Sequence, residues 1–360
     1  VMPQKISVGI DGWERYDKVF FKEDGSDLGK INLNQQPIFS NHRSGWEYAI
    51  DSLMPLHNEE GIFFDGFLEN RFTWKYKDSI KNKIIPYEEP WVGFVHNPVI
   101  NPSHFFSKSY STESLLKKEE FKKSLENCKG IFTLSKYLSN YIYDNVKITT
   151  CSLILPTLIP DLIFNYEKFI ANKSKKIINI GYWLRKLNSI FLLPLDDDSG
   201  YTKIRLRPYD SKSPISVINK ITDIEKKELK LNFQDEDLKR YRLNTKTFKR
   251  LDDHIYDEML SENLVFLDLY DSSANNAITE CIARATPVLV NRIPAVEEYL
   301  GEDYPFYFDS LERAAEKALD FELIKETHEY LLNWEVRKKL TQEYFRESLR
   351  NSKIFTVDIL

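Results

Sequence analysis

At several points in this chain, polar and charged side chains directly follow short apolar segments. Parallel sheets bind their ligands at the carboxyl ends of the strands, so side chains at such points are candidate binding groups. In one case the turn Asp271–Asn276 follows an apolar run and leads into a helical pattern that carries Glu280. The start of such a helix offers backbone N–H groups that suit a phosphate, and Glu280 could accept hydrogen bonds from hydroxyls. The alternative is an ordinary strand–helix–strand unit in which Glu280 is solvated.

The elements around this turn can be predicted from its neighbours. Val265–Leu269 is short, apolar and rich in strand formers, so it predicts a buried strand. Ala277–Ala285 has the apolar spacing of a helix, which should end at Thr286 because a proline follows it. Val288–Asn291 predicts a second strand. A strand, helix and strand in this order form a βαβ unit, whose strands should be parallel.

A pair of cations follows another predicted strand. The run 176–181 predicts a buried strand that ends in glycine. Residues 183–193 predict a helix with Arg185 and Lys186 near its beginning. Cations at the carboxyl edge of a sheet can neutralise an anionic leaving group, although two cations on a helix can also be a simple surface pair.

Two candidate groups end apolar strands in the first half of the chain. His96 closes the run 91–96, two residues before Pro98, where it could bind a hydroxyl, act as a base, or bind phosphate when protonated. It could equally stabilise its own loop. Asp65 ends the apolar run 61–65, where a carboxylate can be a base or a ligand-orienting group. A turn-forming role is the alternative for Asp65.

A third group of candidates surrounds a predicted helix start at Ser44–Gly45. Glycine at such a place lets a ligand or another segment approach the backbone; a simple capping turn is the alternative. Glu47, in the first turn of this helix, joins His96 and Asp65 as a possible base. His42 and Arg43 stand beside the turn.

Composition limits the class of protein. The chain has 360 residues, which favours two domains. Its hydrophobic content of 42% and charged content of 29% are typical of a globular protein. A formal charge of −5 argues against a general nucleic-acid binder. Aromatic residues make up 14% of the chain and could serve as core or as platforms for sugar rings.

The cysteines and the hydropathy pattern suggest a location. Cys128, Cys151 and Cys281 are far apart and form neither a disulfide framework nor a metal-site pattern. We therefore expect a reducing, cytoplasmic environment. No run approaches the roughly 18 apolar residues of a transmembrane helix, and no signal peptide is apparent. The acidic run Leu195–Gly200 is interpreted as a loop and not as a metal site.

The sequence from Asn275 to Asn291, followed by Pro294–Gly301, resembles the nucleotide-sugar-binding segment of GT-B glycosyltransferases, particularly the family 4-like ones. The resemblance implies that Glu280 holds the ribose hydroxyls of the donor. It also implies that the segment around the helix start faces the diphosphate or the sugar, through Ser273, Asn275, Asn276 and Ala277. Family members often have another Glu eight residues before this one; here Ser272 stands there, with Asp271 beside it.

The same resemblance assigns roles to the other candidates. It implies that Arg185 and Lys186 hold the donor diphosphate, that the glycine loop at Gly45 faces the donor and acceptor cleft, and that the loop of His96 reaches this cleft from the first domain. GT-B enzymes do not generally need a metal, so no metal or other cofactor is expected.

The expected fold class is α/β, with two Rossmann-like domains facing a cleft and C-terminal helices crossing back to the first domain. Residues 1–155 would form the N-terminal, acceptor-side domain, with 1–37 either its first strand region or an appended β unit. Residues 156–335 would bind the nucleotide sugar, and 336–360 would pack on the N-terminal domain.

The expected function is transfer of a sugar from a nucleotide-diphosphate sugar to a hydroxyl of a glycan or other acceptor, as in polysaccharide biosynthesis. His96, Asp65 and Glu47 are the candidate bases if the reaction inverts. Two alternatives stay open at this point. One is a nucleotide-sugar epimerase of the same architecture, and the other is a non-catalytic binding module that retains the fold.

Overall fold

The computed structural model describes residues 44–99, 101–102, 110–206, 212–232 and 234–357, together with the short stretches 5–7, 13–16, 30–34 and 36–37. The chain divides into two compact units. The first consists of Val1–Asn101, Phe106–Leu158 and Lys339–Leu360, and the second of Pro102–Phe105 and Ile159–Lys338. His42, Arg43 and the segment from 103 to 109 lie outside the described residues.

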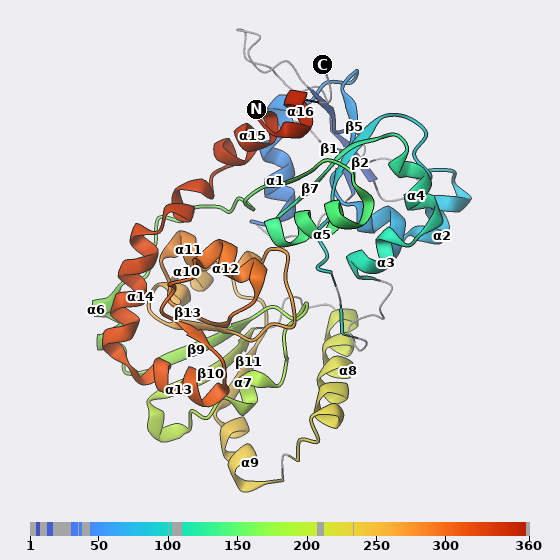
Figure 1. Cartoon of the computed structure of the whole chain (residues 1–360). Helices are drawn as coiled ribbons and strands as arrows, with labels where there is room; N and C mark the ends of the chain where they lie inside the picture. The colour runs from blue at the N-terminus through green and yellow to red at the C-terminus, as the bar shows by residue number, and fades with distance from the viewer. Residues whose placement is uncertain are drawn as a thin grey trace. The chain divides into compact units, whose positions relative to one another are not determined.

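A five-stranded sheet forms the centre of the first unit, with the strand order β3-β5-β6-β7-β8. Every pair of neighbouring strands in it is parallel. Figure 1 labels β5 and β7 of this sheet. The strands are β3 (Ile31–Asn32), β5 (Ile62–Asp65), β6 (Trp91–Phe94), β7 (Cys128–Thr133) and β8 (Thr150–Ser152). Parallel strands place their carboxyl ends at one edge, so Asp65 and the residues after Phe94 meet there.

The helical elements of the first unit connect these strands. They are α1 (Trp46–Ser52), the 3₁₀ turn Met54–Leu56, a π-helical turn (Asn70–Trp74), α2 (Tyr76–Lys81), α3 (Thr112–Leu116), α4 (Glu119–Leu125), α5 (Lys136–Val146), α15 (Gln342–Arg350) and α16 (Lys353–Val357). Ser135 caps α5 by accepting a hydrogen bond from the N–H of Leu138 at 3.3 Å, as its position predicts.

The apolar spacing of residues 114–128 predicts one long amphipathic helix, but the structure has two short ones. Lys118 is extended between α3 and α4, with φ −74° and ψ 135°. The break lets Leu115 and Phe121 enter the same core from separate helices. The chain then starts β7 at Cys128, which the sequence pattern had placed in the helix.

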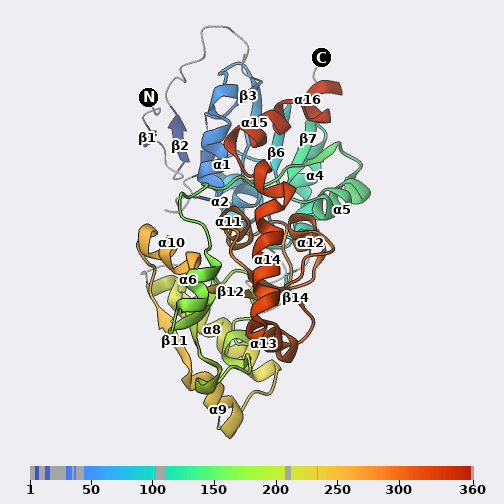
Figure 2. The ribbon, with the colours of Figure 1, turned by 90° about the vertical axis from the view of Figure 1, so that its left-hand side faces the viewer.

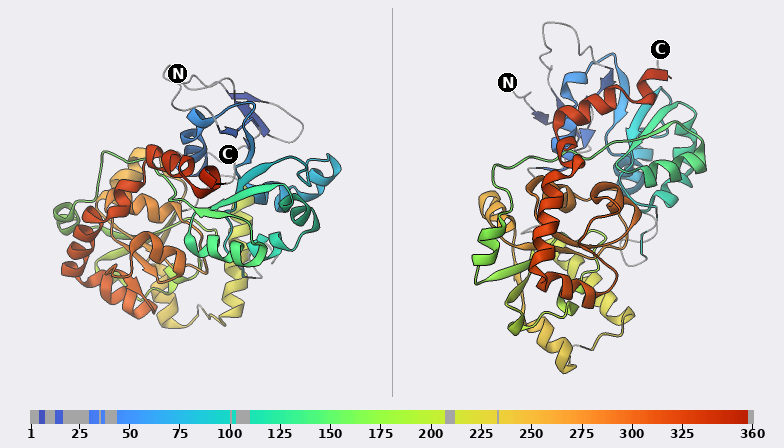
Figure 3. Two further views of the ribbon diagram at one scale, coloured as in Figure 1. Left: turned by 45° about the horizontal axis from the view of Figure 1, so that its top comes forward. Right: turned by 60° about the vertical axis from the view of Figure 1, so that its left-hand side comes forward.

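The C-terminal helices return to the sheet of the first unit, which confirms that part of the expected fold. Phe345 of α15 lies against the rings of Trp46 and Phe94, with centroid distances of 6.2 and 6.0 Å. Ile354 of α16 packs on Gly130 of β7 so closely that a Cβ atom at 130 would lie 2.5 Å from it. In Figure 3, α15 and α16 are the last helices of the chain, coloured red, and they lie beside the sheet of the first unit.

The first 37 residues contribute to two sheets. β1 (Lys5–Ser7), β2 (Trp13–Tyr16) and β4 (Gln36–Pro37) form an antiparallel three-stranded sheet, whereas β3 joins the main parallel sheet. The sequence predicts strands at 5–10 and 18–21 with a connection between them, and this is wrong for residues 13–16 of the connection, which form β2. The strand expected at 18–21 lies outside the described residues.

The second unit contains a six-stranded parallel sheet with the order β11-β10-β9-β12-β13-β14. Its strands are β9 (Lys175–Ile180), β10 (Tyr201–Leu206), β11 (Thr245–Phe248), β12 (Leu264–Leu267), β13 (Val288–Asn291) and β14 (Tyr307–Phe308). β12 and β13 are parallel and joined by α11 (Asn276–Arg284), which confirms the predicted βαβ unit.

The remaining helical elements of this unit are α6 (Tyr166–Ala171), α7 (Ser189–Leu192), a 3₁₀ turn (Asp197–Ser199), α8 (Lys212–Glu228), α9 (Glu236–Leu243), α10 (Asp253–Ser261), α12 (Pro294–Leu300), α13 (Leu311–Leu319) and α14 (Phe321–Asn333). α14 passes beside the ends of α11 and α12 (Figure 2). There His328 bonds the carbonyl of Ala285 at 2.8 Å, and the hydroxyl of Tyr330 donates to Leu300 at 2.7 Å. No described helix is long and apolar enough to cross a membrane.

The helix expected over 183–193 is wrong for most of its length. Only Ser189–Leu192 is helical. Leu184 has a left-handed backbone with φ 55°, and its carbonyl accepts a hydrogen bond from the N–H of Tyr270 at 2.9 Å. The N–H of Lys186 donates to the carbonyl of Asp268 at 2.8 Å. Pairing with the chain after β12 therefore prevails over the local helical pattern.

Candidate functional site

The guanidinium of Arg185 lies over a glycine at the carboxyl end of β9. Gly181 has φ 82°, and a Cβ atom there would lie 3.1 Å from Nη2 of Arg185. A residue with a side chain would thus be strained and would also displace the guanidinium. Nε donates to the carbonyl of Ile180 at 3.2 Å, and Nη1 donates to that of Trp183 at 2.7 Å. The strand-ending glycine therefore makes room for the cation.

Asn275 joins this cation to the start of α11. Its Oδ1 atom accepts a hydrogen bond from Nη2 of Arg185 and another from the N–H of Ala277, both at 3.0 Å. One side chain thus caps the helix and holds the arginine. Burial lowers the pKa of Arg185 to about 10, so the side chain is charged at neutral pH. The structure thereby brings together Arg185, Asn275 and Ala277, which the sequence predicted separately.

Lys186 is held by a carboxylate that the sequence reasoning missed. Its Nζ atom lies 2.8 Å from Oδ1 of Asp268, directly after β12. The other oxygen of Asp268 accepts a hydrogen bond from Oγ of Ser189 at 2.7 Å. The side chain of Asp268 is 8% exposed and that of Lys186 is 39% exposed. The cation therefore reaches the surface while its partner stays buried.

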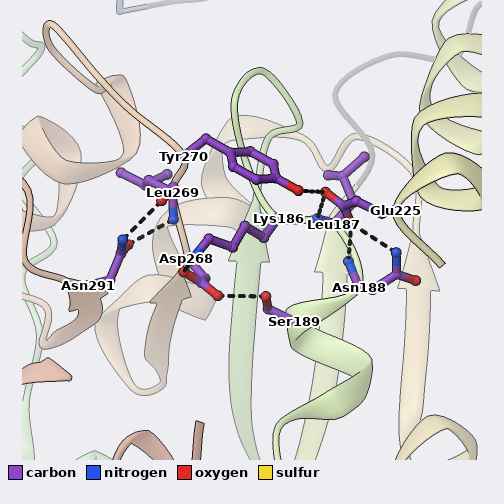
Figure 4. A network of polar contacts seen from close by, with 9 residues as sticks. All are labelled: Lys186, Leu187, Asn188, Ser189, Glu225, Asp268, Leu269, Tyr270 and Asn291. Carbon is purple, nitrogen blue, oxygen red and sulfur yellow. Dashed lines mark hydrogen bonds and ion pairs between the residues drawn. The ribbon is translucent and has the colours of Figure 1, made fainter. Parts of the chain in front are cut away.

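Glu225 is a second missed carboxylate, and it connects α8 to both loops of this site (Figure 4). Its Oε1 atom accepts hydrogen bonds from the N–H of Leu187 at 3.1 Å and from the hydroxyl of Tyr270 at 2.9 Å. Oε2 accepts from the N–H of Asn188 at 3.0 Å and from its side-chain amide at 2.8 Å. The segment that follows the two cations is thus fixed by three hydrogen bonds to Glu225, and a fourth, from Tyr270, ties the other loop to the same side chain.

A sequence signal for Glu225 exists. The charged residues 220–233 predict a surface helix, yet Glu225 in α8 is only 1% exposed. It stands four residues after Ile221, which stands three after Ile218, and both isoleucines are buried. This spacing places Glu225 on the apolar face of the helix. A carboxylate on such a face needs hydrogen-bond partners, and this site provides them.

Asn291, at the end of β13, completes the edge of the sheet. Its side-chain oxygen accepts a hydrogen bond from the N–H of Leu269 at 2.8 Å, and its amide donates to the carbonyl of Leu269 at 2.9 Å (Figure 4). The side chain therefore continues the pairing between β12 and β13 beyond their last residues, up to the start of the turn at Asp271.

Glu280 is not the solvated helix residue of the alternative interpretation. It is 2% exposed, and its Oε2 atom accepts a hydrogen bond from the hydroxyl of Tyr256 at 2.6 Å. Burial and the adjacent carboxylate raise the pKa of Tyr256 well above its ordinary value, so the phenol keeps its proton. Glu280 is therefore a buried, oriented acceptor on α11.

The turn before α11 is largely buried. Ser272 and Ser273 are 5% and 2% exposed, and the N–H of Ser272 donates to its neighbour Asp271 at 2.8 Å. Asn276 is the first helical residue. The N–H of Ala277 is already bonded to the cap, so the start of α11 presents fewer backbone donors than its position suggests.

In the first unit, His96 lies at the carboxyl edge of the sheet among aromatic rings. Its centroid is 4.2 Å from that of Trp46 and 4.3 Å from that of Phe67. Nε2 lies 3.0 Å from the carbonyl of Gly66, which requires the proton on this nitrogen. Burial lowers the pKa of His96 to about 4. The ring is therefore neutral near pH 7, which disfavours phosphate binding by an imidazolium.

Asp65 is fully buried and bonded through both oxygens. Oδ1 accepts from the N–H of Phe67 at 2.9 Å, and Oδ2 accepts from the hydroxyl of Tyr87 at 2.5 Å. The first contact is that of a turn-forming aspartate, and the geometry thus fits the turn interpretation better than a role as base.

Gly45 and Glu47 flank the tryptophan that contacts His96. Gly45 is the N-cap of α1 with φ 121° and ψ −151°, a conformation that favours glycine. Glu47 lies in the first turn of α1, where its charge suits the helix dipole.

Glu69 was not singled out from the sequence; it is 1% exposed and bonded to the loop of His96.

No protein-family model matches the chain, and no curated protein matches it significantly. Solved structures share its architecture. The trehalose-6-phosphate synthase OtsA matches with a TM-score of 0.54 at 12% identity, over 84% of this chain and 74% of that one. HepE of Anabaena, solved with UDP and glucose, matches with a TM-score of 0.56 at 8% identity, over 80% and 76%.

A third match is the sucrose-phosphate synthase of Thermosynechococcus elongatus, with a TM-score of 0.52 at 12% identity over 81% of this chain and 74% of that one. These proteins are glycosyltransferases of the GT-B class. At such identities the likeness establishes the fold: this chain has the α/β GT-B fold, with one parallel sheet in each unit.

Proposed function

We propose that this protein is a glycosyltransferase that moves a sugar from a nucleoside-diphosphate sugar to a hydroxyl of a glycan or other acceptor. The observation that carries the proposal is the bond from Arg185 to Asn275 at 3.0 Å. It joins a charged guanidinium to the start of α11 at the carboxyl edge of the sheet, where ligands of open α/β sheets bind. The fold shared with known glycosyltransferases supports the same reading.

The diphosphate of the donor would lie against Arg185, Lys186 and the start of α11. Three N–H groups of Arg185 are bonded within the protein, to Ile180, Trp183 and Asn275. Its two remaining N–H groups could bond a phosphate. Lys186 adds a second charge. As the bond to the sugar breaks, these cations would stabilise the charge that develops on the departing diphosphate.

The nucleoside would lie toward Glu280, whose carboxylate is a suitable acceptor for ribose hydroxyls. The hydroxyl of Tyr256 orients this carboxylate. The segment Ser273–Ala277 would line the diphosphate or the sugar. HepE was solved with UDP and glucose, which makes a UDP-sugar the first donor to test.

We propose that the acceptor binds to the first unit, on the side of Gly45 and His96. If the reaction inverts, His96 is a better candidate base than Asp65. Its imidazole is neutral near pH 7, although burial lowers its pKa to about 4 and so makes it a weaker base than an exposed histidine, whereas both oxygens of Asp65 are already bonded. Glu47 remains the second candidate.

The reaction as proposed needs no metal or other cofactor, because the two cations supply the charge that a metal would otherwise provide. Transfer measured with and without EDTA tests this point. The rate should be unchanged by the chelator, and a loss that Mg²⁺ or Mn²⁺ restores would contradict it.

A donor screen tests the proposed function. Thermal unfolding would be followed with UDP-, GDP- and CMP-sugars, and the stabilising donor would then be incubated with candidate acceptors. One nucleotide class should raise Tm, and transfer should follow. Turnover of the donor without any acceptor would favour the epimerase alternative. Binding without any turnover would favour the non-catalytic module, and no stabilisation by any nucleotide would contradict both the transferase and the epimerase.

A further inference from the structure

Glu69 follows the end of β5 and is bonded to the loop that follows β6. Its side chain is 1% exposed. The Oε1 atom accepts hydrogen bonds from the backbone N–H groups of both His96 and Asn97, each at 2.6 Å. Short bonds of this kind to a carboxylate are stronger than neutral ones. One oxygen therefore fixes two successive peptide groups of the loop.

The second carboxyl oxygen, Oε2, is buried and has no hydrogen-bond partner within the described part of the chain. The nearby Asp65 differs, because its Oδ2 accepts from the hydroxyl of Tyr87, to which Arg71 also donates at 3.3 Å. Buried carboxyl oxygens are normally bonded, so this exception requires an explanation. A π-helical turn begins directly after Glu69, and such turns are frequent at functional sites.

The loop held by Glu69 carries the ring of His96. Trp46 and Phe67 pack beside the ring, and the carbonyl of Gly66 bonds its Nε2 atom. These contacts determine how the ring is turned, whereas Glu69 determines where its backbone lies. The Oε1 atom of Glu69 is already engaged by two N–H groups of the loop, so the contacts of this side chain act on the backbone of His96. Its effect on a reaction must therefore pass through His96.

We propose that Glu69 is a positioning residue, which through its Oε1 atom holds the backbone of His96 where the imidazole can act on an acceptor hydroxyl. The part of this proposal that concerns the acceptor rests on the proposed function. The part that concerns the loop does not. Leaving Oε2 without a partner costs free energy in the folded protein. On this proposal the cost is accepted because the side chain must place Oε1 between the N–H groups of His96 and Asn97.

Two substitutions separate positioning from a general structural role. In Glu69→Gln the amide oxygen can accept the same two hydrogen bonds, so the loop should keep its place. In Glu69→Ala both bonds are lost. A displacement of about 1 Å in a reacting group can lower a rate by about 100-fold. We therefore expect Glu69→Ala to lower kcat by a factor of this order and to leave KM for the donor nearly unchanged, while Glu69→Gln restores most of the rate.

The decisive comparison repeats Glu69→Ala in a His96→Ala background. If Glu69 acts only through His96, the second substitution should cause little further loss of kcat, because residues that act as a unit are not additive. A full additional loss in that background would overturn the proposal. Glu89→Gln, which changes an exposed carboxylate in the same unit, is the control and should behave as the wild type.

A measurement without substrate keeps the inference separate from the proposed function. Hydrogen exchange of the His96 and Asn97 amides would be followed by NMR in the wild type, Glu69→Gln and Glu69→Ala. Protection should be retained in the glutamine variant and lost in the alanine variant. Equal protection in all three would overturn the positioning role. A wild type that transfers no sugar would instead overturn the proposed function, and the exchange result would still decide what Glu69 does.

Discussion

At the scale of single residues, Glu280 and the hydroxyl of Tyr256 form the most specific pair in the second unit. The carboxylate is buried, and a hydrogen bond of 2.6 Å orients it. A buried acceptor that is fixed in this way loses little conformational entropy when it binds a hydroxyl. It is therefore the side chain whose removal should affect nucleoside binding most selectively.

Glu280→Ala should weaken binding of the stabilising nucleotide by roughly 1–3 kcal/mol, because hydrogen bonds to a charged group are lost. Isothermal titration calorimetry measures this directly. Tyr256→Phe is the matched control, since it removes the orienting hydroxyl and leaves the carboxylate in place, and its effect should be smaller. Unchanged nucleotide affinity in Glu280→Ala would remove Glu280 from the site.

Glu69 and His96 should contribute to stability with opposite pH dependence. Burial raises the pKa of Glu69 from 4.5 to about 7. Its contribution to the free energy of unfolding is therefore present below pH 4.5 and is lost as the pH rises through about 7. Burial lowers the pKa of His96 from 6.5 to about 4. Its contribution is present above pH 6.5 and is lost as the pH falls through about 4.

Because the two windows overlap, the two contributions should largely cancel in the wild type between about pH 4.5 and 6.5. Relative to the wild type, Glu69→Gln should become more stable with rising pH over this range, and His96→Gln should become less stable. Each difference is on the order of 3 kcal/mol at most. Urea unfolding at several pH values measures the free energy of unfolding of each protein. If this free energy changes with pH in the same way in all three proteins, neither group titrates as described.

At the scale of elements, α7 is the feature that needs support from outside itself. It has four residues, too few to be stable alone. Glu225 of α8 binds the two N–H groups just before it, and Lys203 of β10 donates to the carbonyls of Phe191 and Leu193 at its end, at 3.2 and 2.9 Å. Burial lowers the pKa of Lys203 to about 7. Buried groups thus hold both ends of the helix that follows the two cations.

Glu225→Ala should destabilise the second unit by roughly 3 kcal/mol or more, because it leaves several buried donors without an acceptor. It should also weaken nucleotide binding, since Leu187 and Asn188, which directly follow Lys186, lose their hydrogen bonds to Glu225. Asp223→Ala, on the same helix with a side chain that is 66% exposed, should change stability by no more than about 0.5 kcal/mol. Equal effects of the two substitutions in urea unfolding would contradict this role of Glu225.

The strand and helix bounds around α11 could be predicted because each rests on a local signal. Apolar runs mark β12 and β13, and the proline after Thr286 places the end of the helix within two residues of Arg284, where α11 ends. The conformation of Arg185 could not be predicted, since it depends on pairing with Leu269, which is remote in sequence. Asp268 and Glu69 were missed because isolated carboxylates resemble surface residues until their partners are known.

At the scale of the whole molecule, the last part of the chain belongs to the first unit. Phe345→Ala should destabilise that unit by roughly 3–5 kcal/mol, because a fully buried ring is removed from contact with Trp46 and Phe94. Hydrogen exchange measured by mass spectrometry should show faster exchange in β6 and α1. If the loss of protection falls instead on residues 159–338, the assignment of the C-terminal helices to the first unit is wrong.

The central claim is that the second unit binds a nucleoside diphosphate through Arg185, and calorimetric titration of UDP and GDP into the wild type and Arg185→Met tests it most directly. The wild type should bind one of the two nucleotides. Arg185→Met should bind it at least about 10-fold more weakly, because charged hydrogen bonds of roughly 1.5–3 kcal/mol are lost. Equal affinity of the two proteins, or no binding of either nucleotide by the wild type, would contradict the account.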